Sequence, residues 1–196
     1  MNVAIIKYNA GNIYSVDYAL KRLGITPRIT ADAEELRAAD KVIFPGVGEA
    51  STTMNYLREH GLDEVIRSLR QPVLGICLGM QLLCRASEEG DTECLGIFDT
   101  EVKRFVARKH EDKIPHMGWN TITEVQDGLF TPAEEGQFVY FVHSFYVPKN
   151  PWTAATTDYI LPFSAALHRD NFYATQFHPE KSGSVGERIL KNFLTL

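Results

Sequence analysis

The sequence is poor in cysteine, in net positive charge and in long apolar runs. It holds 3 cysteines among 196 residues, an odd and sparse number that does not suit a disulfide framework. Their spacing lacks the paired Cys-x-x-Cys pattern of a structural zinc site. A net charge of −5 argues against a sequence-independent nucleic-acid binder, which needs a surplus of lysine and arginine. We therefore expect neither a metal site nor a nucleic-acid partner.

Membrane-spanning and export signals are also missing. The longest mainly apolar stretch, residues 73–84, is too short to span a bilayer and contains two glycines. The first residues, 1–7, have no basic region before their apolar run and no cleavage site. They are typical of a first β-strand, so we expect a cytoplasmic protein without a membrane partner.

Length and composition are those of an ordinary globular protein. Apolar residues make up 44% and charged residues 23% of the chain, and there is no repeat, low-complexity tract or linker. A chain of this length fits one continuous core. We expect residues 1–196 to form a single α/β domain.

In the first half, short apolar runs alternate with amphipathic segments. This alternation predicts a mostly parallel central sheet with helices on both faces. Asp32 is expected to cap a helix, with Glu35 completing a capping-box-like pair. The other predicted segments are strands at 2–7, 27–30, 41–44 and 73–76, and helices at 13–23, 50–59, 62–69 and from Cys77 onward.

The second half has many strand-like segments and few helices. We expect its neighbouring strands to form antiparallel hairpins that extend the central sheet. A final helix is predicted from the helical spacing of Val185, Ile189, Phe193 and Leu194. The predicted strands are 101–106, 121–125, 138–142, 153–157, 164–168 and 173–177.

The segment Gly75-Ile76-Cys77-Leu78-Gly79 lies between a predicted strand and a predicted helix. This context is that of a nucleophile elbow, in which side chains two residues before and after the nucleophile would collide. A helix N-terminus favours the thiolate of Cys77, and the backbone N–H of Leu78 is a candidate oxyanion donor. The alternative is a buried cysteine at a tight glycine-rich turn. Cys84 and Cys94, the latter expected in a polar loop, are given no role.

The segment His178-Pro179-Glu180 can supply a base and the group that orients it. Pro179 favours an extended His178, and residues two apart in an extended segment point to the same side. His178 and Glu180 can then stand side by side, which completes a Cys–His–Glu triad with Cys77. Taken alone, the two residues could instead be a strand-end histidine and a solvated charge.

These segments together resemble the triad-type (class I) glutamine amidotransferases, and the resemblance extends over nearly the whole chain. Pro45-Gly46-Val47-Gly48 is similar to the glycine-rich oxyanion strand of the family, which implies that Val47 and Gly48 join Leu78 in the oxyanion hole. The resemblance also implies a substrate site for glutamine. Its residues would be Gln81, Glu89, His143, Ser144 and Phe145.

Within the family, the chain most resembles the glutaminase subunits that serve imidazole glycerol phosphate synthases of histidine biosynthesis. Four segments carry this likeness: Gly11-Asn12-Ile13-Tyr14-Ser15, Pro45-Gly46-Val47-Gly48, Pro115-His116-Met117-Gly118-Trp119-Asn120 and Glu180-Lys181-Ser182. The implied partner is a (β/α)₈ cyclase in a heterodimer, which receives ammonia and forms imidazole glycerol phosphate and aminoimidazole carboxamide ribotide. Asn12, Trp119 and Lys181 would face it.

The implied reaction is hydrolysis of glutamine to glutamate and ammonia through a γ-glutamyl thioester, without a cofactor. Other readings are a glutaminase for another synthase, such as those for anthranilate or pyridoxal phosphate, and a cysteine peptidase or γ-glutamyl hydrolase. A non-catalytic binding subunit would have no need of an intact triad. The basic residues between Lys103 and Lys113 are interpreted as a solvated hairpin.

Overall fold

A seven-stranded sheet forms the centre of the protein, in a computed structural model that describes residues 1–9, 12–126 and 128–196. Its strand order within these residues is β11-β12-β13-β4-β3-β1-β2. β2, β1, β3, β4 and β13 pair in parallel, and β12 and β11 extend the sheet in antiparallel fashion. The strands are β1 (Val3–Ile6), β2 (Arg28–Thr30), β3 (Lys41–Phe44), β4 (Val73–Ile76), β11 (Thr153–Tyr159), β12 (Leu161–Arg169) and β13 (Phe172–Thr175).

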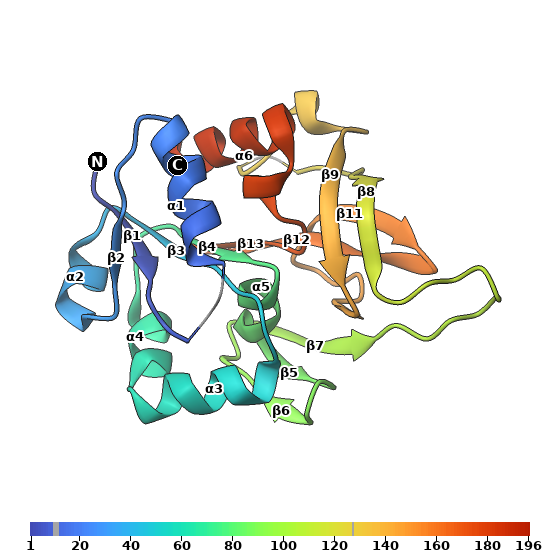
Figure 1. The fold of residues 1–196 in the computed structure, drawn as a ribbon, viewed down its shortest axis with the longest axis horizontal. Coiled ribbons are helices and arrows are strands. Elements are labelled where there is room, and N and C mark those ends of the chain that lie inside the picture. Colours follow the sequence, from blue (N-terminus) through green and yellow to red (C-terminus); the bar gives the residue numbers. More distant parts are fainter. Residues whose placement is uncertain (10–11, 127) are drawn as a thin grey trace.

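Helices cover both faces of the sheet, as the alternating pattern predicts (Figure 1). Helices α1 (Ile13–Arg22) and α6 (Gly183–Thr195) lie on one face. The opposite face carries α2 (Ala33–Ala38), α3 (Ala50–Glu59), α4 (Leu62–Ser68) and α5 (Leu78–Leu83). The expected mostly parallel α/β fold is confirmed, and it places the carboxyl ends of β3, β4 and β13 at one edge.

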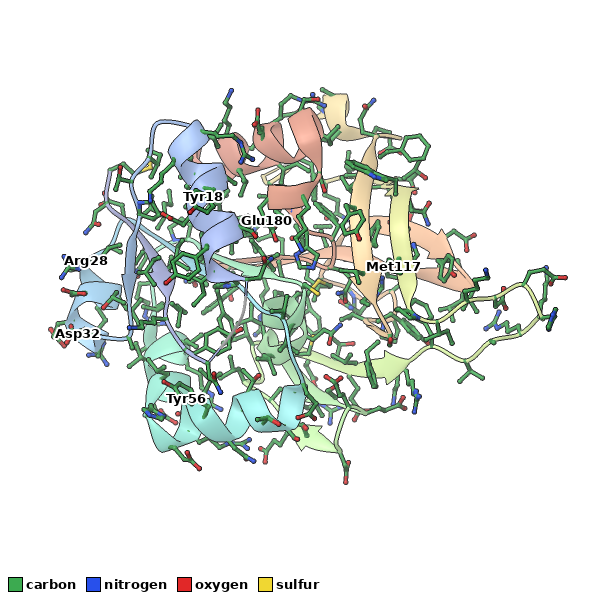
Figure 2. The ribbon with its side chains drawn as sticks, in the orientation of Figure 1. Tyr18, Arg28, Asp32, Tyr56, Met117 and Glu180 are labelled. Atoms are coloured by element: carbon green, nitrogen blue, oxygen red, sulfur yellow. The ribbon has the colours of Figure 1, made fainter. Side chains whose placement is uncertain are left out.

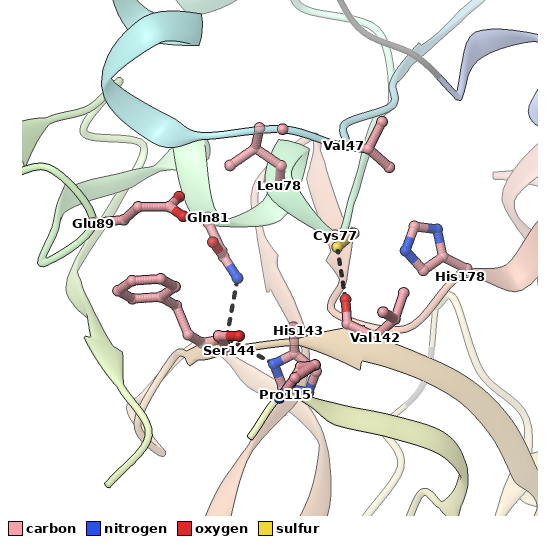
Figure 3. Close-up of a pocket in the computed structure, with 12 residues that line it drawn as sticks. Val47, Cys77, Leu78, Gln81, Glu89, Pro115, Val142, His143, Ser144 and His178 are labelled. Carbon is pink, nitrogen blue, oxygen red and sulfur yellow. Dashed lines mark hydrogen bonds between the residues drawn. The ribbon is translucent and has the colours of Figure 1, made fainter. Parts of the chain in front are cut away.

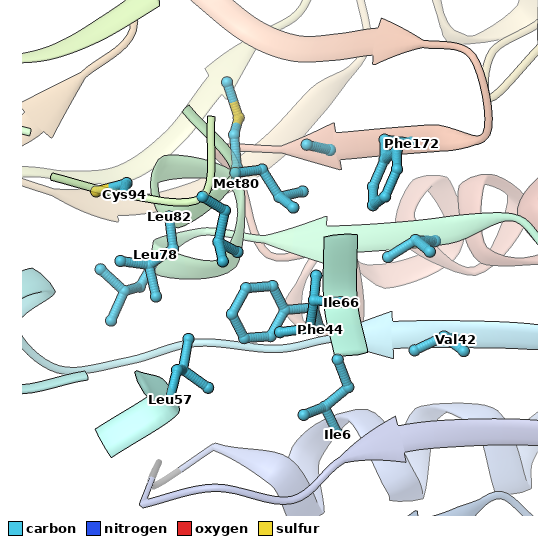
Figure 4. Packing of buried hydrophobic residues seen from close by; sticks show 14 of the residues in the cluster. Ile6, Val42, Phe44, Leu57, Ile66, Leu78, Met80, Leu82, Cys94 and Phe172 are labelled. Atoms are coloured by element: carbon cyan, nitrogen blue, oxygen red, sulfur yellow. The ribbon is translucent and has the colours of Figure 1, made fainter. Parts of the chain in front are cut away.

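Each central strand contributes alternate side chains to the two cores, because successive side chains on a strand point to opposite faces. On β3, Val42 and Phe44 pack toward α3 and α4, whereas Ile43 packs toward α1 and α6. Figure 4 shows Phe44 with Leu57 of α3 and Ile66 of α4. Both faces of these strands are therefore buried, and their sequences are nearly continuous apolar runs.

Only part of the second half extends the central sheet, which corrects the expectation that all its hairpins would do so. A second sheet has the order β10-β7-β5-β6, and β8 pairs with β9 alone. In Figure 1, β5, β6 and β7 lie beside α5, whereas β8 and β9 lie beyond α6. The strands of these two sheets are β5 (Cys84–Ser87), β6 (Thr92–Glu93), β7 (Phe98–Arg104), β8 (His116–Thr121), β9 (Phe138–His143) and β10 (Phe145–Tyr146).

Two local predictions were wrong. The strand expected at 121–125 lies earlier, as β8, because its partner β9 pairs with His116–Thr121. Asp32 does cap α2 by accepting from the Glu35 N–H, but the Glu35 carboxylate pairs with Arg28 and does not return the bond. The N–H of Asp32 donates to the Thr30 hydroxyl instead.

The connection between β7 and β8 projects from the body of the protein (Figure 1). Its basic residues Arg108 and Lys109 are exposed, and their backbone N–H groups donate to the Asp112 carboxylate. At its base, Lys103 pairs with Glu88 and Glu101. Lys103 is thus paired locally, whereas the charges of Arg108 and Lys109 are exposed to solvent. Among the described helices, none is long and apolar enough to cross a membrane.

Candidate active site

Cys77 lies at a sharp turn between β4 and α5. Its backbone has φ 54° and ψ −108°, a conformation that residues with a side chain rarely adopt. Such strain persists only where the surroundings hold the backbone in place, and it is typical of a nucleophile elbow. The turn aims the Cys77 side chain into a cavity beside His178 (Figure 3).

The glycines around Cys77 are required by close backbone approach. A Cβ atom on Gly79 would lie 2.1 Å from the Phe44 carbonyl oxygen at the end of β3. A Cβ on Gly75 would lie 3.0 Å from the Gly79 carbonyl carbon. On Gly46, a Cβ would lie 2.7 Å from the Gly79 nitrogen and 2.8 Å from Leu78 Cβ. The elbow therefore packs directly against the segment that follows β3.

Strand β13 brings the His178 segment to the same place. It pairs in parallel with β4, with Thr175 opposite Ile76, and the Cys77 N–H donates to the Thr175 carbonyl at 2.8 Å. His178 is extended, but Pro179–Lys181 forms a 3₁₀ turn, η2, rather than the extended segment expected from the sequence. The turn still places the His178 and Glu180 side chains together.

The ring of His178 is held by Glu180 and is almost fully buried. Nδ1 of His178 lies 2.7 Å from Glu180 Oε1, which also accepts from Asn12 Nδ2 at 2.8 Å. Nε2 of His178 has no hydrogen-bond partner among the described residues, so this nitrogen is available toward Cys77. Burial alone would lower the pKa of His178, but interactions with Cys77 and Glu180 raise it above its ordinary value. The ring can therefore act as a strong proton acceptor.

The N–H group of Leu78, the expected oxyanion donor, is already hydrogen-bonded to the backbone of Gly46. The Leu78 N–H donates to the Gly46 carbonyl oxygen at 3.3 Å, so it does not point freely into the cavity. In a planar trans peptide, the carbonyl and the N–H point in opposite directions, so the Val47 N–H is directed away from Leu78. The peptide whose carbonyl engages the Leu78 N–H is thus Gly46–Val47.

One cavity of about 360 Å³ brings most of the expected site residues together (Figure 3). Glu180 lies behind His178, outside the lining. Pro115 and Val142 line the cavity but were not expected as site residues, although each lies beside a segment that was. The lining residues are Val47, Gly48, Cys77, Leu78, Gln81, Glu89, Pro115, Val142, His143, Ser144, Phe145 and His178.

Gln81 and Glu89 supply polar groups on the side of the cavity away from His178 (Figure 3). Nε2 of Gln81 donates to the Phe145 carbonyl at 3.1 Å and to Gln176 Oε1 at 3.0 Å. Both its N–H groups are used, which leaves its oxygen as an acceptor. Glu89 Oε2 accepts from the Ala50 N–H at 2.9 Å, and burial raises the pKa of Glu89.

Two buried histidines support the His143–Phe145 segment. Nδ1 of His143 donates to the Phe145 carbonyl at 2.6 Å, so Nε2 of His143 must accept from Nδ1 of His116, at 2.9 Å. Nε2 of His116 in turn accepts from Asn120 Nδ2 at 3.3 Å. Burial lowers the pKa of His116 to about 4 and that of His143 to about 3. Both rings are neutral, and every hydrogen bond in the chain has a fixed direction.

The expected partner-facing residues lie outside the cavity. Trp119 and Lys181 are exposed, and Asn12 connects the start of α1 to Glu180. Gly11, the first residue of the early glycine motif, lies outside the described residues. Cys84 and Cys94 are both buried, and Cys94 lies in the loop between β6 and β7, as expected. Burial raises the pKa of Cys94 to about 12 and that of Cys84 well above its ordinary value, so neither thiol is reactive.

The fold and the site together define an α/β protein with a cysteine at a strand–helix elbow, opposed by a histidine–carboxylate pair. Residues 4–196 match the family "Glutamine amidotransferase class-I". The chain belongs to this family.

Particular relatives match over the full length of both chains. Proteins named "Imidazole glycerol phosphate synthase subunit HisH" are 71% identical in Bacteroides fragilis and 46% identical in Escherichia coli. Each match covers 100% of this chain and 100% of the relative.

Solved structures agree on the fold. A glutamine amidotransferase is similar at a TM-score of 0.75 and 21% identity, covering 99% of this chain and 98% of that one. A chain in the structure of PurLQS from Thermotoga maritima is similar at a TM-score of 0.71 and 16% identity, and the match covers 99% of this chain and 97% of that one.

The neutral histidine pair predicts a loss of stability in mild acid. Unfolding exposes both imidazoles, which then take up protons below their ordinary pKa of 6.5, whereas the folded protein resists protonation to about 4 and 3. Their stabilising effect is full above pH 6.5 and is lost as pH falls. Between pH 7 and 5, the parent should lose about 2 kcal/mol more than His116→Gln, measured by urea unfolding. His110→Gln, which changes a histidine in the exposed loop, is the control. If it reduced the pH dependence of the free energy of unfolding as much as His116→Gln does, the assignment of that dependence to His116 would be wrong.

Proposed function

We propose that the protein is the glutaminase subunit of an imidazole glycerol phosphate synthase. It hydrolyses glutamine and supplies the ammonia to a cyclase partner in histidine biosynthesis. The observation that carries this proposal is the single cavity in which Cys77 and His178 face the polar groups of Gln81 and Glu89. The full-length relatives named as synthase subunits support the same function and disfavour the other synthases and peptidases.

In this proposal, the two ends of the cavity hold the two ends of glutamine. The α-ammonium group pairs with the Glu89 carboxylate and with the free oxygen of Gln81. The backbone of His143, Ser144 and Phe145 holds the α-carboxylate. The side-chain amide then reaches Cys77 at the other end of the cavity, beside His178 (Figure 3).

The triad carries out acyl transfer in two stages. Nε2 of His178 takes the Cys77 proton as the sulfur bonds to the amide carbon, and the carbonyl electrons move to oxygen. The oxyanion collapses, the carbon–nitrogen bond breaks, and the nitrogen leaves as ammonia with the proton from His178. Water then attacks the thioester with His178 as base and releases glutamate and the thiol. Glu180 orients the ring and stabilises its positive charge.

The oxyanion hole is incomplete in the resting arrangement. For Leu78 and Val47 to donate to one oxyanion, the Gly46–Val47 peptide must turn so that its carbonyl leaves the Leu78 N–H. Gly48 has φ 125°, and glycines on both sides of Val47 allow such a rotation at low cost. We propose that partner binding favours the turned state through differential contacts.

Exposed apolar side chains on α1, β8 and β9 fit a docking surface for the partner subunit. Tyr14 and Tyr18 project from α1, Met117 and Trp119 from β8, and Phe138 from β9, each more than half exposed. The segment around η2 lies between the two parts: Glu180 accepts from Asn12 at the start of α1, and the Tyr140 backbone on β9 bonds both His178 and Ser182. Figure 2 shows Glu180 between Tyr18 and Met117. A (β/α)₈ cyclase docked here would lie directly over the triad.

Cys77→Ala should abolish glutamine hydrolysis, because no other described thiol reaches the cavity. The reconstituted synthase should still use added ammonia at close to the parent rate, because the cyclase chemistry lies in the partner. Both activities can be assayed on the same complex. The matched control is Cys94→Ala, which removes a buried thiol away from the site. Residual glutaminase activity in Cys77→Ala would refute the nucleophile assignment.

Trp119→Ala should weaken the partner complex by about 2 kcal/mol, as expected for a buried aromatic anchor at an interface. The isolated subunit should lose less than about 0.5 kcal/mol of stability, because the side chain is exposed. Titration calorimetry and urea unfolding give the two values. His60→Ala removes an exposed ring beyond α3, on the other face of the sheet, and should leave partner affinity unchanged. Equal affinity for parent and Trp119→Ala would place the interface elsewhere.

The free subunit should hydrolyse glutamine slowly, and the partner should accelerate it by about 10²–10³, the usual contribution of one oxyanion donor. Glutamate release with and without the cyclase measures this. A structure of the thioester or of an oxyanion mimic should show the Gly46–Val47 carbonyl turned away from Leu78. Equal rates for the free and complexed subunits would exclude the switch, and activation with an unturned peptide would locate it elsewhere.

A further inference from the structure

Gln176 lies beside the nucleophile and has no part in the triad. It directly follows β13, is fully buried, and its backbone N–H donates to the Ala165 carbonyl at 2.8 Å. Because β13 and β4 are adjacent parallel strands, Gln176 and Cys77 leave the sheet at the same edge. Its side-chain nitrogen lies 3.7 Å from the Cys77 sulfur.

The orientation of this amide follows from its neighbours. Gln81 presents an NH₂ group, whose two N–H groups donate to the Phe145 carbonyl and to Gln176 Oε1. If the Gln176 amide were turned over, its NH₂ would face that of Gln81 and its oxygen would face the sulfur. The first contact has no acceptor, and the second would repel a thiolate. Gln176 must therefore direct its N–H toward Cys77.

The hydrogen bonds that fix Gln81 extend through the Phe145 carbonyl to the two buried histidines. The Phe145 carbonyl accepts from Gln81 and from Nδ1 of His143, so both of its lone pairs are used. The His143 ring is in turn held by His116. A chain of directed hydrogen bonds thus runs from His116 to the Cys77 sulfur, and Gln176 is its last member.

We infer that Gln176 is a further catalytic residue, a buried amide that donates an N–H to the Cys77 sulfur whenever that sulfur carries negative charge. The inference rests on the proposed function for its role in glutamine hydrolysis. Cys77 is itself nearly buried, and burial disfavours a thiolate unless donors compensate. In the thiol form, the S–H group donates only weakly, to the Val142 carbonyl at 3.9 Å.

The donor acts at two points of the reaction. When the Cys77 proton passes to His178, the thiolate gains the Gln176 N–H as a partner. The contact weakens when the sulfur–carbon bond forms, because the sulfur loses its charge. It strengthens again when water expels the sulfur from the thioester and the thiolate returns, before His178 gives back the proton. Gln176 itself makes and breaks no covalent bond.

Gln81 connects this donor to the substrate. Its N–H groups hold Gln176 and Phe145, while its oxygen lies on the Glu89 side of the cavity, where the ammonium of glutamine is proposed to bind (Figure 3). A substrate ammonium that donates a hydrogen bond to the Gln81 oxygen polarises the same side-chain amide that orients Gln176. Substrate binding and the stabilisation of the Cys77 thiolate are thereby coupled through the side chains of Gln81 and Gln176.

The pH dependence of Cys77 alkylation tests the inference without relying on glutamine hydrolysis. Chloroacetamide reacts with the thiolate, and peptide mapping distinguishes Cys77 from the two buried cysteines. Gln176→Met keeps the approximate shape but removes the donor, and Gln176→Glu keeps the acceptor for Gln81 while placing a carboxylate near the sulfur. A hydrogen bond to a charged group is worth about one to two pKa units, so alkylation at neutral pH should slow roughly ten- to hundredfold in both variants.

Gln71→Met is the matched control, because it removes a different amide whose Nε2 donates to the Leu36 carbonyl, away from the site. It should keep the parent alkylation profile, and circular dichroism with thermal melting checks that all variants fold. An unchanged profile in folded Gln176→Met or Gln176→Glu would overturn the inference. If the shift occurs but the parent releases no glutamate from glutamine, even with its partner, the donor role stands and the proposed function fails.

Discussion

The parallel pairing of β13 with β4 is the interaction on which the rest of the site depends. It joins parts of the chain about a hundred residues apart and sets Thr175 opposite Ile76. Both strands end at the same edge, so the residues that follow them meet: Cys77 after one, Gln176 and His178 after the other. The strained Cys77 backbone is held partly by this pairing, since its N–H donates to the Thr175 carbonyl.

A second constraint is that the polar groups of the site are buried and must satisfy one another. His116, His143, Gln81 and Gln176 lie almost wholly out of water, and their hydrogen bonds leave few choices of direction. A partly satisfied network of this kind would cost more than an apolar core. The substrate cavity is therefore rigid on the Phe145 side. The part that we propose to adjust is the Gly46–Val47 peptide.

The sequence predicted best what is local. The strands at 41–44 and 73–76 end at glycine-rich turns, and Cys77, His178 and Glu180 are recognisable by residue type and setting. β8 was misplaced because it contains Gly118 and polar residues, and becomes a strand only through its partner β9. The engagement of the Leu78 N–H depends on a carbonyl from another strand, and a glutamine such as Gln176 has no sequence signature. These features arise from tertiary contacts.

The pairing of β13 with β4 limits where the chain can gain or lose residues. Adding or deleting one residue within β13 (Phe172–Thr175) would shift its register against β4 and displace Gln176 and His178, which follow the strand. The projecting connection between β7 and β8, residues 105–115, has no such constraint along its exposed tip, because loops tolerate length changes. Insertions and deletions among homologues should accumulate there and be absent from the final strand and turn.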